Sequence, residues 1–486
     1  MNLIGDPWIP VVFEDGTDRL VGLRELYQES CHISDLSVDP PQRISLMRLL
    51  LCITHAALDG PNDDSEWLKC LDRIIPESLQ YLQERKDKFY LNGDKPFLQI
   101  KELTSDKKVP FDKLNICLAS GHNATFFDHE ANPSGRFQSM ARKALDLLTF
   151  MNFSTGGKIG QAKWGENKFN NETFAAPCIK SAHTIIRGNN ILKTIYFNLL
   201  SKNVIANFPN MEWGIPVWDN FPDSLEDKER FDNASRTYLG RLVPLSRFIL
   251  LGNDNEKKFI VGPTCKSYVI SHLPEFREPS TTVISTKKGK IIYLPLSSEK
   301  HIWRELGSVL SLSKSKEAGG AACMQNIRKF MDHFKDHIDI WIGGLESNQA
   351  KLIDLVEWNI SIPIDLLGEN TLSLYKNGVD LANNGEQAVR DAVNSYCYEM
   401  SIQKELKKGL RNKAVLNYWS FLDYYYKILI DLANNGEELV EWKRRLYRAM
   451  NGAYYETCPH ETPRQIQAFS KSKGRLMLKT HIEKSK

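Results

Sequence analysis

The strongest constraint on the fold is a change in the hydrophobic pattern near Pro363. Beyond that residue, β-branched runs become rare and apolar side chains recur at helical spacing, as Leu439, Trp442 and Leu446 do. Four segments each predict one helix: residues 388–402, 414–433, 437–450 and 464–478. We therefore expect residues 366–486 to form a C-terminal four-helix bundle.

A repeated heptapeptide marks two positions in or near this region. Asp-Leu-Ala-Asn-Asn-Gly-Glu occurs at residues 380–386 and again at residues 431–437. Asn-Gly is typical of a helix C-terminus because both residues tolerate the left-handed backbone conformation. Each copy therefore predicts a point where one helix ends and the next begins. Shared capping explains the repeat better than a duplicated functional unit, because the similarity fades on both sides.

Residues 1–365 carry a mixed pattern that predicts a large α/β domain, so the expected fold class is α+β. The chain opens with a β-hairpin over residues 8–21, turned by Glu-Asp-Gly-Thr, and continues with a helix over residues 23–28. An apolar run at residues 44–53 predicts a buried helix that Gly60-Pro61 stops. Further strands are expected at residues 89–91, 259–261 and 291–294, and long polar loops at residues 121–138 and 154–172.

Charge and cysteine usage restrict the possible partners and compartments. The net charge of +3 comes from 63 basic and 60 acidic residues, so any contact with nucleic acid must be local. From Arg464 onward, seven basic residues face one acid, which predicts a basic C-terminal face that includes Lys471, Lys473 and Arg475. Nine scattered cysteines without a C-x-x-C pair argue against disulfides and zinc fingers, and favour a reducing cytoplasm.

Targeting and membrane signals are missing from the sequence. The N-terminus has neither a basic region nor an apolar core typical of a signal peptide. No apolar run reaches the roughly 18 residues that span a bilayer. We expect a soluble cytoplasmic protein without membrane contact.

Catalytic motifs do not support an enzyme. The sequence has no P-loop, H-E-x-x-H or G-x-S-x-G pattern, nor an H-x-E paired with C-x-x-C. The expectation is a non-enzymatic protein that needs no metal and no cofactor. An alternative is a free-standing metal-dependent nuclease that uses His122, Asp128 and His129, although such residues often meet in loops by chance. A third reading is a protein-binding scaffold that does not contact nucleic acid.

Two segments have a chemistry suited to nucleic acid. Residues 154–172 combine glycines, which allow the backbone to approach a phosphate, with lysines that neutralise its charge. Residues 343–350 predict a hairpin tip between apolar runs, where Asn348 and Gln349 offer amides to base edges and Ala350 allows a close fit. A flexible surface loop and an ordinary turn would explain the same residues.

Three motifs occur in a recognisable order. They are Met-Asn-Leu-Ile-Gly-Asp-Pro-Trp-Ile-Pro-Val at residues 1–11, Phe-Tyr-Leu followed by Lys-Pro-Phe-Leu-Gln at residues 89–99, and Gly-Gly followed by Asn-Gln-Ala at residues 343–350. Their order and spacing, with the terminal helical bundle, resemble the CasA family along nearly the whole chain. CasA is the large subunit of Cascade, the type I-E CRISPR surveillance complex.

The resemblance implies a function in RNA-guided antiviral defence. Members of the family have a mixed α/β N-terminal domain of unusual fold followed by a four-helix bundle. They recognise the protospacer-adjacent motif in double-stranded DNA from the minor groove, start strand separation and help to recruit a helicase-nuclease. Guide RNA pairing reads the remaining sequence. The implied partners are the DNA target, the CRISPR RNA, the helicase-nuclease, and the backbone, small, 5′-handle-binding and RNA-processing subunits.

The resemblance also assigns roles to individual residues. It implies that Gln349 is a wedge beside the motif, and that Asn348 and Ala350 face the minor groove. The remaining assignments are a glycine loop at Gly156, Gly157 and Gly160; a motif-directed lysine at Lys266, or else Lys257 or Lys258; and a loop that meets the RNA 5′ end and the backbone subunit at Phe127, Asp128 and His129. Some relatives carry paired cysteines for zinc, which this chain lacks, so no metal is implied.

Overall fold

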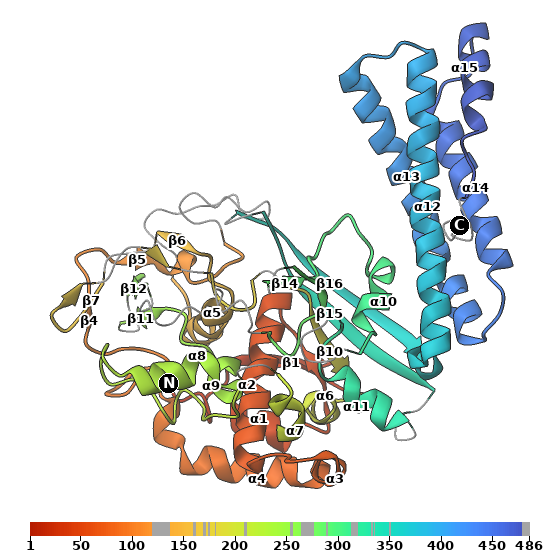
Figure 1. The fold of residues 1–486 in the computed structure, drawn as a ribbon. Helices are drawn as coiled ribbons and strands as arrows, with labels where there is room; N and C mark the ends of the chain where they lie inside the picture. The colour runs from red at the N-terminus through yellow and green to blue at the C-terminus, as the bar shows by residue number, and fades with distance from the viewer. Residues whose placement is uncertain are drawn as a thin grey trace. The chain divides into compact units, whose positions relative to one another are not determined.

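A computed structural model gives the fold of two compact units. It describes residues 1–118, 137–158, 162–168, 172–173, 175–179, 181–208, 211–252, 256–263, 277–287, 290–312, 319–331, 334, 336–348 and 351–478. Unit 1 comprises Met1–Lys300, Leu312–Phe334 and Ile338–Ser361, and unit 2 comprises His301–Ser311, Lys335–His337 and Ile362–Lys486. The α+β class is confirmed, and Figure 1 traces its elements. The domain boundary between residues 365 and 366 stays a prediction.

Unit 1 begins as the sequence predicts. Strands β1 (Ile9–Phe13) and β2 (Asp18–Val21) form an antiparallel hairpin, and β3 (Ile33–Leu36) pairs with the other side of β1. In the turn, Asp15 Oδ1 accepts a hydrogen bond from the Thr17 amide at 2.9 Å. Helix α1 (Leu23–Gln28) follows with the bounds expected from its periodicity.

Helix α2 (Pro40–Leu58) is the central helix of unit 1. Its first turn has a capping box, in which Asp39 and Gln42 satisfy each other's backbone amides, and proline at the first helical positions. Most of its side chains are buried, as predicted for residues 44–53. The other α-helices of unit 1 are α3 (Asp64–Lys69), α4 (Leu71–Glu84), α5 (Met140–Phe153), α6 (Ile191–Asn198), α7 (Lys202–Ala206), α8 (Lys228–Arg236), α9 (Tyr238–Leu242) and α11 (Met324–Lys329).

The remaining strands form several small sheets. Their orders are β10-β15-β16, β11-β12-β5, β4-β7-β8, β13-β14 and β6-β9. The strands are β4 (Leu103–Thr104), β5 (Val109–Pro110), β6 (Gly157–Lys158), β7 (Lys163–Trp164), β8 (Asn167–Lys168), β9 (Glu172–Thr173), β10 (His183–Arg187), β11 (Phe248–Leu250), β12 (Lys258–Gly262), β13 (Val283–Lys287), β14 (Lys290–Tyr293), β15 (His337–Asn348) and β16 (Lys351–Pro363). The strands expected at residues 259–261 and 291–294 are thus present as β12 and β14.

Two local predictions in unit 1 are wrong. Phe89 closes a 3-10 helix over Lys86–Phe89, and Tyr90 makes only an isolated bridge to Asn2, so residues 89–91 are no strand. The expected loop at residues 154–172 contains short strands, because Trp164 is buried and pairs with Leu103 across β4 and β7. In both segments an aromatic side chain packs against residues outside the segment, Phe89 on Phe97 and Trp164 on Phe248. These tertiary contacts override the local preference for strand or loop.

Among the described residues of unit 2, four C-terminal helices are present, as predicted, but their bounds differ. They are α12 (Glu369–Glu399), α13 (Lys404–Asn434), α14 (Val440–Thr457) and α15 (Pro463–Lys473). The second heptapeptide does end a helix, since Gly436 has a φ of +67° just after α13. The first heptapeptide lies inside α12, so the break predicted there is wrong.

Packing against α13 explains why α12 continues through Gly385. A Cβ atom on Gly385 would lie 2.3 Å from the Tyr418 hydroxyl, which donates a hydrogen bond to the Ala382 carbonyl at 2.7 Å. The glycine therefore makes room for a side chain of the next helix rather than ending its own.

A segment from the middle of the chain also belongs to unit 2. His301–Ser311, which includes the short helix α10 (Leu306–Val309), packs with the helices through Trp303. The Trp303 indole donates to Asp423 Oδ1 at 2.7 Å, and the Tyr375 hydroxyl donates to the Trp303 carbonyl at 2.6 Å. The helices of unit 2 are thus completed by residues that precede them by more than fifty positions.

Gly385→Ala is expected to destabilise unit 2 by about 1–3 kcal/mol, because the added methyl displaces Tyr418. Gly409→Ala in the exposed first half of α13 is the matched control, since its Cβ would meet no atom within 4 Å. Alanine should stabilise that site by about 1 kcal/mol through helix propensity. Thermal unfolding followed by circular dichroism measures both, and equal stabilisation by the two substitutions would refute the packing role of Gly385.

Candidate nucleic-acid interface

The candidate interface is built on the hairpin of β15 and β16. These strands are 12 and 13 residues long, and only Gln349 and Ala350 connect them. Both connecting residues lie outside the described part of the chain, and Asn348 is the last residue of β15. Strands β15 and β16 are hydrogen-bonded neighbours in one sheet, so the predicted pairing of these two segments is confirmed. The hairpin tip is shorter than expected, because the strands include residues 343–348.

Two glycines that were assigned to the tip instead pack inside β15. A Cβ atom on Gly343 would lie 2.4 Å from the Trp341 ring and 3.0 Å from the Val356 carbonyl oxygen. Gly344 has a φ of +153°, and its Cβ would approach the Ser181 carbonyl oxygen to 2.9 Å. Close packing at the buried base of the hairpin, rather than a turn, therefore requires glycine here.

Strand β10 holds the base of the hairpin from one side. It pairs antiparallel with β15, from His183 opposite Gly343 to Arg187 opposite Asp339. The Arg187 guanidinium donates to Asn359 Oδ1 of β16 at 3.2 Å and to Asp35 Oδ2 of β3 at 2.8 Å. One side chain therefore links the far strand of the hairpin to the N-terminal sheet.

Two further contacts restrain the hairpin along its length. The buried Trp341 indole donates to Glu357 Oε2 at 2.8 Å, from β15 to β16. Closer to the tip, Glu346 Oε2 accepts hydrogen bonds from the amide and the hydroxyl of Ser298, each at 2.8 Å. The hairpin is therefore pre-organised up to the last residues before Asn348.

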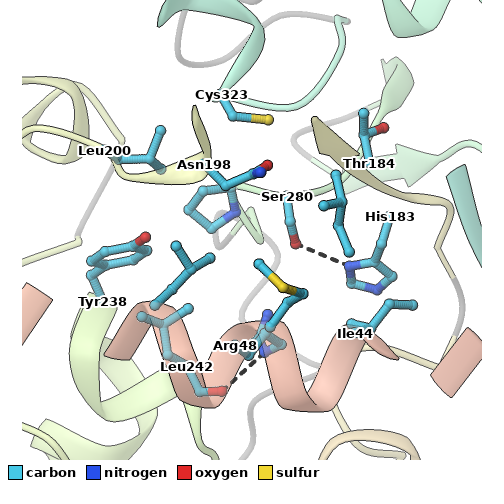
Figure 2. Close-up of a pocket in the computed structure, with 14 residues that line it drawn as sticks. Ile44, Arg48, His183, Thr184, Asn198, Leu200, Tyr238, Leu242, Ser280 and Cys323 are labelled. Carbon is cyan, nitrogen blue, oxygen red and sulfur yellow. Dashed lines mark hydrogen bonds between the residues drawn. The ribbon is translucent and has the colours of Figure 1, made fainter. Parts of the chain in front are cut away.

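A small cavity lies beneath the start of β10. It has a volume of about 40 Å³, and Figure 2 shows the residues that surround it. The His183 ring borders the cavity and hydrogen-bonds the Ser280 hydroxyl at 3.0 Å. Burial, assisted by the Arg48 charge, lowers the pKa of His183 to about 4, so the imidazole is neutral at pH 7. This volume suits two or three water molecules and is too small for a substrate.

Arg48, which also lines this cavity, belongs to a buried ionic network. Its guanidinium donates to Glu278 Oε2 at 2.9 Å and to the Leu242 carbonyl at 3.0 Å. Arg241 donates to the other Glu278 oxygen, and all three charged side chains are nearly inaccessible to solvent. Glu278 is four residues from Thr282, whose backbone bonds to Ala182 beside β10. The network therefore supports the strand that carries the hairpin.

The Pro-Phe-Leu-Gln motif lines a larger surface pocket of about 540 Å³. The motif residues stabilise the local fold. The Gln99 side-chain amide donates a hydrogen bond to the Leu91 carbonyl at 2.7 Å and accepts one from the Leu251 backbone amide at 2.9 Å. The Asp219 carboxylate in the same pocket accepts from Tyr81 at 2.7 Å and from Arg85 at 2.9 Å. In the N-terminal motif, the Trp8 indole similarly donates to the Leu3 carbonyl at 2.9 Å. The family motifs at both sites are therefore packing and hydrogen-bonding residues.

The glycine-rich segment leaves the C-terminal end of α5. Gly156 follows that helix closely, and Gly157 begins β6 opposite Thr173 of β9. Gly157 has a φ of +114°, and its Cβ would meet no atom within 4 Å. Its backbone conformation therefore favours glycine, while the space beside it is open. Gly160 lies outside the described residues.

The other predicted contact residues are placed only in part. Lys257 precedes β12 with its ammonium 5.7 Å from the Phe137 ring centre, and Lys258 is the first residue of β12. Lys266, the loop Phe127-Asp128-His129 and His122 lie outside the described residues. In the part of the chain that is described, no three His, Cys, Asp or Glu side chains are grouped as metal ligands, and no helix is long and apolar enough to cross a membrane.

The predicted basic C-terminal face lies on and just after α15. Lys471 and Lys473 are exposed in its last turn, and Arg475 follows Gly474, so the helix ends before the predicted residue 478. The Lys471 ammonium pairs with Glu399 Oε1 of α12 at 2.7 Å. Lys473 and Arg475 are also exposed.

Sequence reasoning missed the buried arginines that support the interface. Arg48 and Arg241 flank Glu278, and Arg247 is fully buried beside the glycine-rich segment. The available signal was their position in apolar runs, such as Leu-Ser-Arg-Phe-Ile-Leu around Arg247. An arginine within an apolar run is expected to be buried, and a buried charge needs hydrogen-bond partners. The pattern therefore indicates buried, hydrogen-bonded arginines but not which residues they bind.

Comparison with known proteins identifies the family. A family model described as CRISPR-associated protein Cse1 matches residues 2–453. The CRISPR-associated protein CasA/Cse1 of Thermus thermophilus is 27% identical over 377 residues, which cover 75% of this chain and 72% of that protein. A crystal structure of CasA from Thermus thermophilus matches with a TM-score of 0.78 at 21% identity and covers 98% of both chains. A chain of a solved CRISPR RNA-guided surveillance complex matches with a TM-score of 0.80 at 14% identity, over 98% of this chain and 99% of that one. Because the family model spans most of the sequence, the chain belongs to the CRISPR-associated Cse1 family.

Proposed function

We propose that this chain is the large subunit of a type I-E RNA-guided surveillance complex and recognises the protospacer-adjacent motif in duplex DNA. In this role Gln349 enters beside the motif, Asn348 and Ala350 face the minor groove, and strand separation starts at that point. The subunit is non-catalytic and helps to recruit the helicase-nuclease that degrades the target.

The braced hairpin is the observation that carries the proposal. A side chain that separates base pairs must resist displacement, since unstacking one base step costs about a few kcal/mol. Contacts of Arg187, Trp341 and Glu346 restrain the strands as far as Glu346, three residues before Gln349 in the chain. Membership of the Cse1 family, together with fold similarity to a chain of a CRISPR RNA-guided surveillance complex, supports a place in such a complex.

The proposal assigns the other predicted contacts to supporting roles. Gly156, Gly157 and Gly160 lie against the groove, and Lys266 or a neighbouring lysine reaches toward the motif. The Phe127-Asp128-His129 loop meets the CRISPR RNA and the backbone subunit, and Lys471, Lys473 and Arg475 contact DNA phosphates. Because Lys471 already pairs with Glu399, Lys473 and Arg475 contribute more to that contact.

Gln349→Ala is expected to weaken duplex target binding by about tenfold, because one contact at the base edges contributes about 1–3 kcal/mol. Assembly with guide RNA and the other subunits should be unchanged. The measurement is a gel-shift titration of the assembled complex with matched and motif-mutated duplexes.

Gln80→Ala is the matched control, since Gln80 is exposed on α4 and bonds only within that helix, to Glu84. A target that is already unpaired beside the motif should restore binding by the Gln349 variant, because the wedge is then no longer needed. Unchanged affinity of Gln349→Ala for the intact duplex would contradict the wedge assignment.

A further inference from the structure

The residues Ser246, Arg247 and Phe248 lie against the glycine-rich segment at several points. This stretch, which we call the 246–248 anchor, follows α9 and ends at the first residue of β11. All three side chains are buried, and Arg247 is fully inaccessible to solvent. Its contacts fall on the two parts of the glycine-rich segment that the structure describes on either side of residues 159–161.

The first contacts hold the exit from α5. The Ser246 hydroxyl donates to the Met151 carbonyl and lies 3.4 Å from the Ser154 hydroxyl. The Ala176 amide, from just beyond the other end of the glycine-rich segment, donates to the Ser154 carbonyl at 2.8 Å. The backbone is therefore restrained up to the residue before Thr155.

The next contact comes from Arg247. Its Nη2 donates to the Thr155 carbonyl at 2.7 Å, and its Nη1 donates to the Ser246 carbonyl, which orients the guanidinium. Thr155 is the residue immediately before Gly156 and Gly157. Burial lowers the pKa of Arg247, yet the guanidinium stays protonated at neutral pH, so this is a charge-assisted hydrogen bond.

Phe248 holds the middle of the same segment. Its ring makes an edge contact with Trp164 of β7 at a centroid distance of 5.5 Å. Strand β7 follows Gly157 and Gly160 in the chain and pairs with β4. Consecutive residues of the anchor therefore hold the glycine-rich segment before Gly156 and again after Gly160, while the space beside Gly157 is left open.

We propose that Arg247 is a positioning residue that sets the backbone of Gly156 and Gly157 for contact with the minor groove. The inference rests on the proposed function, because it acts only if the glycine segment touches the motif. Arg247 does not touch DNA itself in this scheme. A backbone that must approach a groove closely gains from a rigid support on its inner side, because ordering is then not required on binding.

The test compares Arg247→Lys with Arg277→Lys in the assembled complex. Arg277 is also buried, and it donates to the Thr281 and Gly319 carbonyls, away from the glycine segment. Lysine keeps the charge in both variants but cannot reproduce the guanidinium geometry. Both variants should lower the thermal midpoint, whereas only Arg247→Lys should reduce discrimination between motif-bearing and motif-mutated duplexes, by about tenfold.

A double-substitution cycle separates this inference from the proposed function. Gly157→Ala alone should reduce motif discrimination, and adding Arg247→Lys should then cause little further loss, because both act through the same segment. If Gly157→Ala has no effect, the glycine segment does not read the motif and the proposed function fails at this site. If Gly157→Ala has its effect but Arg247→Lys does not, or if the two effects simply add, the positioning role of Arg247 is refuted.

Discussion

Glu278→Gln is expected to destabilise unit 1 by about 3–5 kcal/mol, the range observed when one partner of a buried ion pair is removed. The Glu278 carboxylate forms ion pairs with both Arg48 and Arg241 in one buried site. Its neutralisation therefore leaves two buried positive charges without a counter-charge. Denaturant unfolding followed by intrinsic fluorescence measures the change. Glu346→Gln is the control, because Glu346 is only half-buried and accepts from Ser298. A loss no larger than that of the control would refute the central role of this network.

The same group predicts an acid dependence of stability. Burial alone would raise the pKa of Glu278, but Arg241 and Arg48 outweigh it and lower the pKa from its ordinary 4.5 to about 2. A carboxyl with a lowered pKa in the folded state stabilises above pH 4.5 and loses that contribution as the pH falls toward 2. The difference in stability between the native chain and Glu278→Gln should therefore narrow over this interval.

Trp303→Ala is expected to destabilise unit 2 by about 3–5 kcal/mol, as is typical of truncating a large buried aromatic side chain. The Trp303 ring stacks with the Tyr426 ring at a centroid distance of 6.1 Å and contacts the Trp442 ring edge-on at a centroid distance of 5.9 Å. Its removal also takes the indole donor from Asp423. Hydrogen exchange of α13 and α14 in the full chain measures the effect locally.

Two other substitutions in the same segment test how Trp303 acts. Trp303→Phe should fall between the native chain and Trp303→Ala, because it keeps a ring and loses the hydrogen bond. His301→Ala should have little effect, because its side chain is 41% exposed and 3.7 Å from Asp423. Unaltered protection of α13 and α14 in Trp303→Ala would mean that the helices stand without this segment.

Local signals predicted those elements whose structure depends on near neighbours. The first hairpin follows from β-forming residues around an Asp-Gly turn, and α1 follows from its apolar spacing. The break predicted at Gly385 failed because Tyr418, more than thirty residues away, occupies the space that the glycine leaves. The identity of a glycine does not reveal whether its turn or its neighbour requires it.

For the candidate interface too, the sequence predicted the segments themselves but not the residues that support them. The hairpin and the glycine segment could be located from the amides near residue 348 and the glycines near residue 157. Their supports could not, because Arg187, Arg247 and Glu278 come from distant parts of the chain and lack a motif. The order of the family motifs pointed to the candidate interface, which stays a prediction, whereas the contacts that restrain the hairpin became visible only in the tertiary structure.

The continuity of α12 has a mechanical consequence. At a rise of 1.5 Å per residue, its 31 residues form a rod of roughly 46 Å. A tilt of about 10° at the Glu369 end would move the Glu399 end by roughly 8 Å in the absence of a break at Gly385 that could absorb the rotation. Close packing of Tyr418 at a glycine thus turns a potential hinge into a stiff lever.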